Sequence, residues 1–205
     1  MLKHQVENSA KVNAQGHSSV DRVMTHIPEG LNRHEGGCEA IPGQSLKPFN
    51  GPYQSGKTHN GIRVFSAKHH PASEGFLQEN FHAVDTFGDI LDQLCGVYEL
   101  SLSSIAIFHD PTGGTIAFNA GKALHFNVCF FYSLHYSQGK QGSQDCYAYW
   151  YTTIAHELAH HLVSAHNKEH GLYTESYVSL YLPKLVMLLT EQESKKLANS
   201  LLGGK

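Results

Sequence analysis

The sequence predicts an α+β fold in which a small mixed sheet is combined with a motif-bearing helix and C-terminal helices. Short apolar segments that alternate like β-strands lie between residues 62 and 131. Residues 74–97, 149–163 and the C-terminal part of the chain instead place apolar side chains at helical spacing. Clusters of Gly, Pro, Asn and Ser separate these segments, as is typical of turns.

Composition places the chain among ordinary globular proteins. Of its 205 residues, 40 % are hydrophobic and 16 % are charged, and the formal net charge is -3. This charge argues against a strongly basic nucleic-acid-binding protein. No window approaches the roughly 18 uncharged apolar residues that a membrane span needs. The first residues contain no apolar signal core, so we expect a cytoplasmic or nuclear protein with no membrane association. The four cysteines form no C-x-x-C pair, and we expect them to be reduced thiols.

A change of composition divides the chain near residue 60. Residues 1–60 are rich in Gly, Ser, Asn, Pro and His, and we expect a flexible or loop-rich N-terminal extension there. Residues 61–205 are expected to form the folded domain. Residues 51–58 match the phosphate-binding pattern G-x-x-x-x-G-K-[ST], but a poor strand precedes them and a turn follows. We therefore interpret this segment as a loop, not as a nucleotide site.

The expected elements follow one another along the domain. The strands are predicted at 62–66, 105–108, 115–118 and 123–131, with a helix at 74–97 and a turn at 119–122 that makes the last two strands a hairpin. After a polar loop at 137–145 we expect helices at 149–163, at about 173–189 and at 191–202, with Pro183 as a candidate for a kink.

The helix predicted at 149–163 carries the motif H-E-x-x-H. At about 100° per residue, His156 and His160 lie about 40° apart around the helix and one turn apart along it, so both rings can reach one point. Imidazole nitrogen is a preferred ligand of Zn²⁺, and a catalytic site keeps one position open for water. Glu157 lies beside this face, where its carboxylate can accept a proton from that water. The motif therefore predicts a zinc site with Glu157 as general base.

A catalytic zinc ion usually has three protein ligands, and three residues are candidates for the third. His166 would lie about 240° from His160 on an unbroken helix, so the helix would have to end near residue 163 or 164 and the chain turn back. Glu175 would come level with His160 if the helix ended near residue 165 and an antiparallel helix began near His170. His170 itself could join the same site, because residues 166–170 also read H-x-x-E-H.

Residues 156–168 resemble the zinc segment of the WLM and SprT-like metallopeptidases, in which H-E-L-x-H is followed after five residues by His and then Asp or Asn. Residues 116–126 are similar to the Asn-x-Gly hairpin that these proteins place before the zinc helix. The resemblance implies a zincin-like fold, His156, His160 and His166 as zinc ligands, and Glu157 as the catalytic base. Nucleic-acid association is implied only by this resemblance, and His125 and Asn127 stand where the family's hairpin has basic residues.

Two functions from different classes are therefore expected. The first is a zinc metalloendopeptidase that hydrolyses a protein or peptide substrate through a zinc-activated water. The second is a non-catalytic, zinc-stabilised interaction module of a larger multidomain protein. Around the site, Tyr173, Tyr177 or His170 could donate a hydrogen bond to an oxyanion, and His125 and Asn127 could edge the peptide cleft. Packing roles for the tyrosines, and ordinary sheet positions for His125 and Asn127, are the simpler interpretation.

Overall fold

The computed structural model describes residues 45–51, 56–112, 114–120 and 123–202. The strands are β1 (Leu46–Pro48), β2 (Arg63–Ala67), β3 (Ile105–His109), β4 (Ala117–Ala120) and β5 (Ala123–Asn127). The α-helices are α2 (Ala72–Glu79), α3 (Phe81–Tyr98), α4 (Val128–Phe131), α5 (Gln144–Ala159) and α6 (Lys168–Leu202). A 3₁₀ turn at Leu102–Ser104 and a π-helical turn at Tyr132–Tyr136 complete the described elements.

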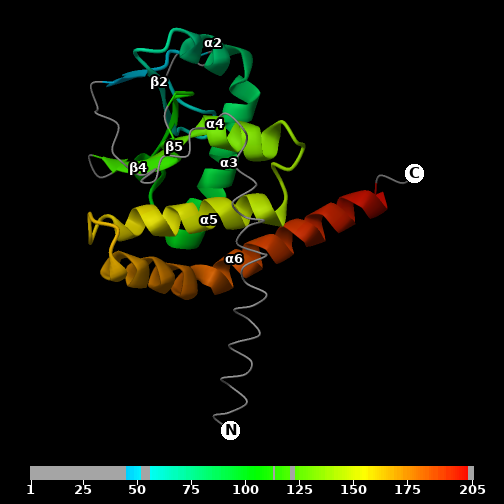
Figure 1. The fold of residues 1–205 in the computed structure, drawn as a ribbon. Helices are drawn as coiled ribbons and strands as arrows, with labels where there is room; N and C mark the ends of the chain where they lie inside the picture. Colours follow the sequence, from blue (N-terminus) through cyan, green and yellow to red (C-terminus); the bar gives the residue numbers. More distant parts are fainter. Residues whose placement is uncertain (1–44, 52–55, 113, 121–122, 203–205) are drawn as a thin grey trace, which may run out of the picture. The chain divides into compact units, whose positions relative to one another are not determined.

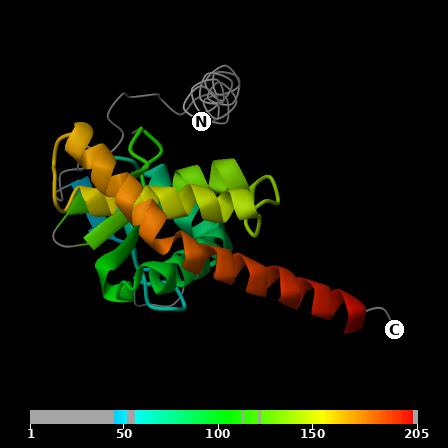
Figure 2. The ribbon, with the colours of Figure 1, turned by 90° about the horizontal axis from the view of Figure 1, so that it is seen from below.

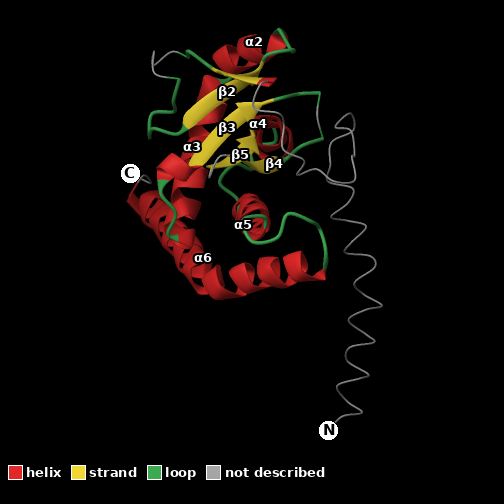
Figure 3. Ribbon diagram, turned by 90° about the vertical axis from the view of Figure 1, so that its left-hand side faces the viewer, coloured by secondary structure: helices red, strands yellow, loops and turns green. Residues whose placement is uncertain are grey.

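The strands form one mixed five-stranded sheet in the order β1-β2-β3-β5-β4 (Figure 3). Strands β2, β3 and β5 are parallel, with Val64 opposite Ile107 and Ile107 opposite Phe126. The two outer strands run antiparallel to their neighbours, and β4 pairs with β5 as a hairpin. The mixed sheet and its helices confirm the α+β class and the predicted hairpin.

An aromatic cluster joins the helices to one face of the sheet. Phe87 of α3 stacks on Phe131 of α4, with ring centroids 4.5 Å apart, and lies equally close to Trp150 of α5. Trp150 also meets Phe126 of β5 edge-on at 6.1 Å. All four side chains are buried. Large buried rings contribute much of the apolar area in a core of this size, so this cluster fixes α5 relative to the sheet.

Helices α5 and α6 lie side by side, and α6 continues beyond the beginning of α5 (Figures 1 and 2). Tyr98 packs against both, with ring centroids 5.0 Å from Tyr151 and 4.9 Å from Tyr181. Figures 1 and 3 show α6 bending partway along, and Pro183 lies within it, where it removes a backbone hydrogen bond. In the described ranges, no helix has both the length and the apolar character to cross a membrane.

Several element boundaries differ from the expectation. The helix predicted at 74–97 is interrupted at Asn80, whose φ of -112° and ψ of 27° are not helical. The strand predicted at 123–131 ends at Asn127, and α4 begins there because the Asn127 side chain accepts from the Cys129 N–H. The two predicted C-terminal helices are one helix, α6, which starts at Lys168 and accommodates Pro183 with a bend.

Part of the segment expected to be an N-terminal extension belongs to the sheet. Strand β1 pairs with β2, and Phe49 after it is buried. Thr58, at the end of the phosphate-loop-like segment, is buried and its hydroxyl bonds Asn60 and Ile62. In residues 59–62, which the structure describes, there is no helix between this segment and β2, in agreement with the loop interpretation. Residues 1–44 and 52–55, which the prediction also covered, lie outside the described residues.

The buried side chain of Asn127 ties the β4–β5 hairpin to the end of β3. Its amide donates to the carbonyls of Asp110 and Thr115, at 2.9 and 3.0 Å. Its oxygen accepts from the N–H groups of Asp110 and Cys129. The single side-chain amide of Asn127 therefore pairs with backbone N–H and carbonyl groups that the hydrogen bonds between strands leave unpaired.

We expect Asn127→Asp to lower the free energy of unfolding by about 3 kcal/mol or more, since two buried carbonyls lose their donor and face a carboxylate. Urea unfolding at neutral pH measures this change. Asn199→Asp, which adds the same charge on an exposed position of α6, is the control and is expected to change little. Equal stability of the two variants would contradict the role given to Asn127.

Candidate metal centre

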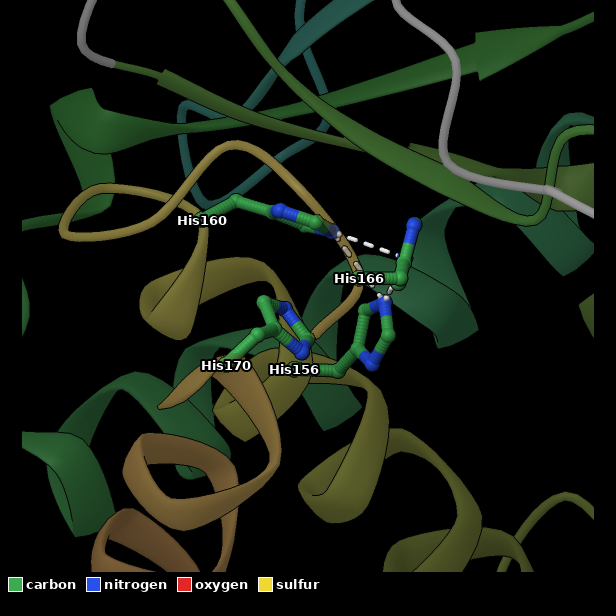
Figure 4. A group of neighbouring side chains, drawn as sticks. All are labelled: His156, His160, His166 and His170. Atoms are coloured by element: carbon green, nitrogen blue, oxygen red, sulfur yellow. Dashed lines mark hydrogen bonds between the residues drawn. The ribbon is translucent and has the colours of Figure 1, made fainter. Parts of the chain in front are cut away.

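Four histidines converge where α5 ends and α6 begins. They are His156, His160, His166 and His170, and one nitrogen of each lies within 4.8 Å of those of the other three. His156 comes from the last turn of α5, His160 follows its last residue, His166 lies in the connecting turn and His170 is in the first turn of α6. Figure 4 shows the four side chains pointing toward one another. This group could hold a metal ion.

Three of the rings already have the spacing of metal ligands. The Nε2 atoms of His156 and His166 are 3.1 Å apart, as are those of His160 and His166, and those of His156 and His160 are 3.3 Å apart (dashed in Figure 4). Zinc–nitrogen bonds of about 2.0–2.1 Å in a tetrahedron place two ligand nitrogens about 3.3–3.4 Å apart. The triangle of Nε2 atoms therefore fits one face of a tetrahedral site.

The early end of α5 creates this geometry. The N–H groups of Leu162 and Val163 both donate a hydrogen bond to the carbonyl of Ala159, and the helix ends there. The chain then reverses through His166 to Asn167. The Asn167 side chain accepts from the His170 N–H at 3.0 Å, and such a capping contact starts α6. Two helix ends thus hold the short segment that brings His166 and His170 back to α5.

A backbone carbonyl orients the His160 ring. Its Nδ1 lies 3.2 Å from the Val163 oxygen, which can only accept, so Nδ1 carries the proton. The lone pair of the ring is then on Nε2, the atom that faces His156 and His166. This is the usual way in which a second hydrogen bond selects the metal-binding tautomer of histidine.

Burial favours the neutral form of three of these imidazoles. It lowers the pKa of His156 to about 4, with a further contribution from the neighbouring His170, His160 and His166. Burial also lowers the pKa of His160, although the Val163 carbonyl opposes this. The pKa of His170 is lowered by burial and by His166. A metal ion binds only the unprotonated nitrogen, so the site is prepared for a cation at neutral pH.

His170 is the most enclosed member of the group. Only 4 % of its surface is exposed, and its Nε2 is buried with no hydrogen-bond partner among the described residues. A buried polar atom without a partner is costly, and a bound ion or water molecule is a common explanation. The donor set and this unpaired nitrogen together fit a bound metal ion.

Glu157, the predicted base, follows His156 on α5 and is 1 % exposed. About 100° separates successive helical residues, so its carboxylate emerges beside the face that carries His156 and His160. A buried carboxylate next to a cation site can exchange a proton with a molecule held there. The arrangement thus places a buried carboxylate next in sequence to His156, which is in the group of histidines that could hold a metal ion.

Of the candidates for a third ligand, the structure brings His166 and His170 to the pair, whereas Glu175 is exposed and outside the group. The geometric case for Glu175 assumed that α5 ended near residue 165, but it ends at Ala159 and α6 starts at Lys168. Because α5 is shorter than that case assumed, the residue of α6 that comes close to His156 and His160 is His170 and not Glu175. The H-x-x-E-H pattern was the signal in the sequence for including His170.

The other residues considered near the site have different surroundings. His125 lies on β5, an inner strand, and its ring stacks on Phe118 with centroids 4.6 Å apart. Asn127 is the buried backbone anchor described above. Tyr173 is exposed on α6 and outside the histidine group. The strands at the edges of the sheet are β1 and β4, so His125 and Asn127 lie one strand inside the β4 edge.

Comparison with known proteins gives no relative from which to assign the site: no family model, curated protein or solved structure matches the chain. The chemistry of the centre therefore rests on its residues and their geometry.

We expect the purified protein to bind about one metal ion per chain, and His156→Ala and His166→Ala to lose it, since each removes one corner of the Nε2 triangle. Elemental analysis after dialysis measures the content. Glu175→Ala, outside the group, and His161→Ala, an exposed neighbour in the same turn, are controls that should keep the metal. Metal loss in Glu175→Ala with retention in His166→Ala would reverse the ligand assignment.

Proposed function

We propose that this protein is a zinc-dependent metallopeptidase in which His156, His160 and His166 hold Zn²⁺ and Glu157 is the general base. One observation carries the proposal: the three Nε2 atoms, 3.1–3.3 Å apart, have the spacing of a tetrahedral face beside a buried glutamate on the same helix. Three nitrogen ligands with a neighbouring carboxylate are the usual composition of a hydrolytic zinc site.

Zinc is the metal that suits this donor set best. Imidazole nitrogen is also a ligand for copper, nickel and iron, but Ca²⁺ and Mg²⁺ prefer oxygen. The spacing of the nitrogens is compatible with tetrahedral coordination, which Zn²⁺ adopts readily and Cu²⁺ and Ni²⁺ favour less. The resemblance of residues 156–168 to the WLM and SprT-like segment adds to this choice.

The chain's own groups would divide the work of hydrolysis. When bound, zinc lowers the pKa of a water molecule and polarises the scissile carbonyl. Glu157 accepts a proton as this water attacks and transfers it to the leaving amine. His160, held by Val163, keeps its Nε2 directed at the site throughout.

The edge of the sheet supports the proposal of a peptide substrate. Strand β4 is at the edge of the sheet, antiparallel to β5, and α5 packs beside it. An extended peptide can pair with such an edge through backbone hydrogen bonds, next to the histidine group. This is also how a zincin-like fold would present a peptide. A protein or peptide in a cytoplasmic or nuclear setting is therefore the proposed substrate, with any nucleic-acid association supported by the resemblance alone.

A second candidate function follows from His170. If all four histidines bind the metal, the tetrahedral positions are filled, as in structural zinc sites. The protein would then be a zinc-stabilised interaction module without hydrolytic activity. The buried, unpaired Nε2 of His170 is the observation that favours this alternative.

We expect Glu157→Gln to keep the metal but to lower peptide hydrolysis by about 10²–10⁴-fold, because the amide cannot accept the proton. Activity on an unfolded protein such as casein, measured with metal content on the same samples, tests this. The matched control is Glu169→Gln, an exposed glutamate in the first turn of α6, which should retain activity. Full activity in Glu157→Gln would rule out the proposed base.

A further inference from the structure

We propose that His170 is a fourth ligand in the resting protein, so that the metal centre is closed until this imidazole leaves it. This role rests on the proposed function and adds a control step to the same site. The three-histidine arrangement does not require His170.

The surroundings of the His170 ring are the first reason. His170 is only 4 % exposed, and its Nε2 has no hydrogen-bond partner among the described residues. Leaving such an atom unpaired is costly, so a buried imidazole is normally bonded or bound to a metal. The nearest groups that could share a ligand with it are three other histidines.

The position of the ring is the second reason. The His170 ring lies 4.2 Å from His160, 4.5 Å from His156 and 5.0 Å from His166, measured between centroids. It therefore faces all three rings rather than one. Its ligand nitrogen is within 4.8 Å of theirs, whereas the other three nitrogens are within 3.3 Å of one another. The widest separation in the group therefore involves His170, and the other three nitrogens form a tighter set.

The element that carries His170 is the third reason. The residue belongs to the first turn of α6, which Asn167 caps, and the chain between α5 and α6 is short and exposed. His156 belongs to α5 and His160 follows its last residue, and the aromatic core holds this helix in place. A small displacement of the α6 start would therefore remove His170 from the centre and leave the α5 pair unchanged.

The step is a simple ligand exchange. The bond between the metal and the His170 nitrogen breaks, the imidazole keeps its electron pair, and one water molecule from solvent takes the vacated position. No proton, oxidant or reductant is needed. Only the open form would be competent for hydrolysis, which reconciles a four-histidine centre with the peptidase proposal.

Coordination of the zinc-loaded, full-length protein tests this directly. X-ray absorption at the zinc edge should show four imidazoles in the wild type, and three imidazoles with one oxygen in His170→Phe. Phenylalanine keeps a buried aromatic ring of similar bulk but provides no nitrogen. His161→Ala, an exposed histidine in the same connection, is the control and should resemble the wild type.

A ligand that needs an open position gives a second measurement. Acetohydroxamate, which binds zinc through two oxygens, should bind His170→Phe about tenfold or more tightly than the wild type, because the closed form excludes it from most wild-type molecules. Calorimetric titration of both proteins and of His161→Ala measures the ratio.

The outcomes separate the two proposals. Three imidazoles and one oxygen in the wild type, with equal hydroxamate affinity in His170→Phe, would overturn the role of His170 and leave the peptidase proposal intact. Four imidazoles in the wild type, with no hydrolysis by either wild type or His170→Phe, would support the fourth ligand and refute the peptidase. The wild-type spectrum decides the ligand count even if the variant does not fold.

Discussion

The end of α5 at Ala159 is the constraint on which the histidine centre depends. Had the helix continued, His166 would lie about 240° around from His160 and far from the face that carries His156 and His160. Ending the helix one turn earlier than its apolar pattern suggests leaves residues 160–167 free to reverse direction. The Val163 carbonyl and the Asn167 cap then fix the reversed segment at both of its ends.

The aromatic core makes this arrangement rigid. Trp150 on α5 contacts both Phe87 and Phe126. Tyr98 contacts Tyr151 of α5 and Tyr181 of α6, and so connects the two helices. The α5 pair of histidines therefore stands on a helix that is packed on the sheet and on α6. Preorganised ligands lower the entropic cost of binding, because few torsions remain to be fixed when the ion arrives.

Crowding of four imidazoles has an energetic consequence. Buried, uncharged histidines lose their hydration, and the pKa values of His156 and His170 fall further because protonation would place charges beside one another. A bound cation would supply one positive charge that the lone pairs of the rings share. Three coordinating rings would leave one position of a tetrahedral centre for water, whereas four would fill it. Because His170 lies in the first turn of α6, the position of that turn determines which of the two applies.

Local patterns were sufficient for much of this molecule. The α+β class, the strands near 62–66 and 105–108, the hairpin and the helical character of the segment with His156 and His160 follow from residue periodicity, since spacing within one element is a local property. The interruption at Asn80 and the continuation of α6 through Pro183 do not, because packing against neighbouring elements overrides local preference there. The choice among His166, His170 and Glu175 also lay outside local pattern. It depends on where α5 stops and where α6 starts, and only the packing of the two helices on a common core determines those ends.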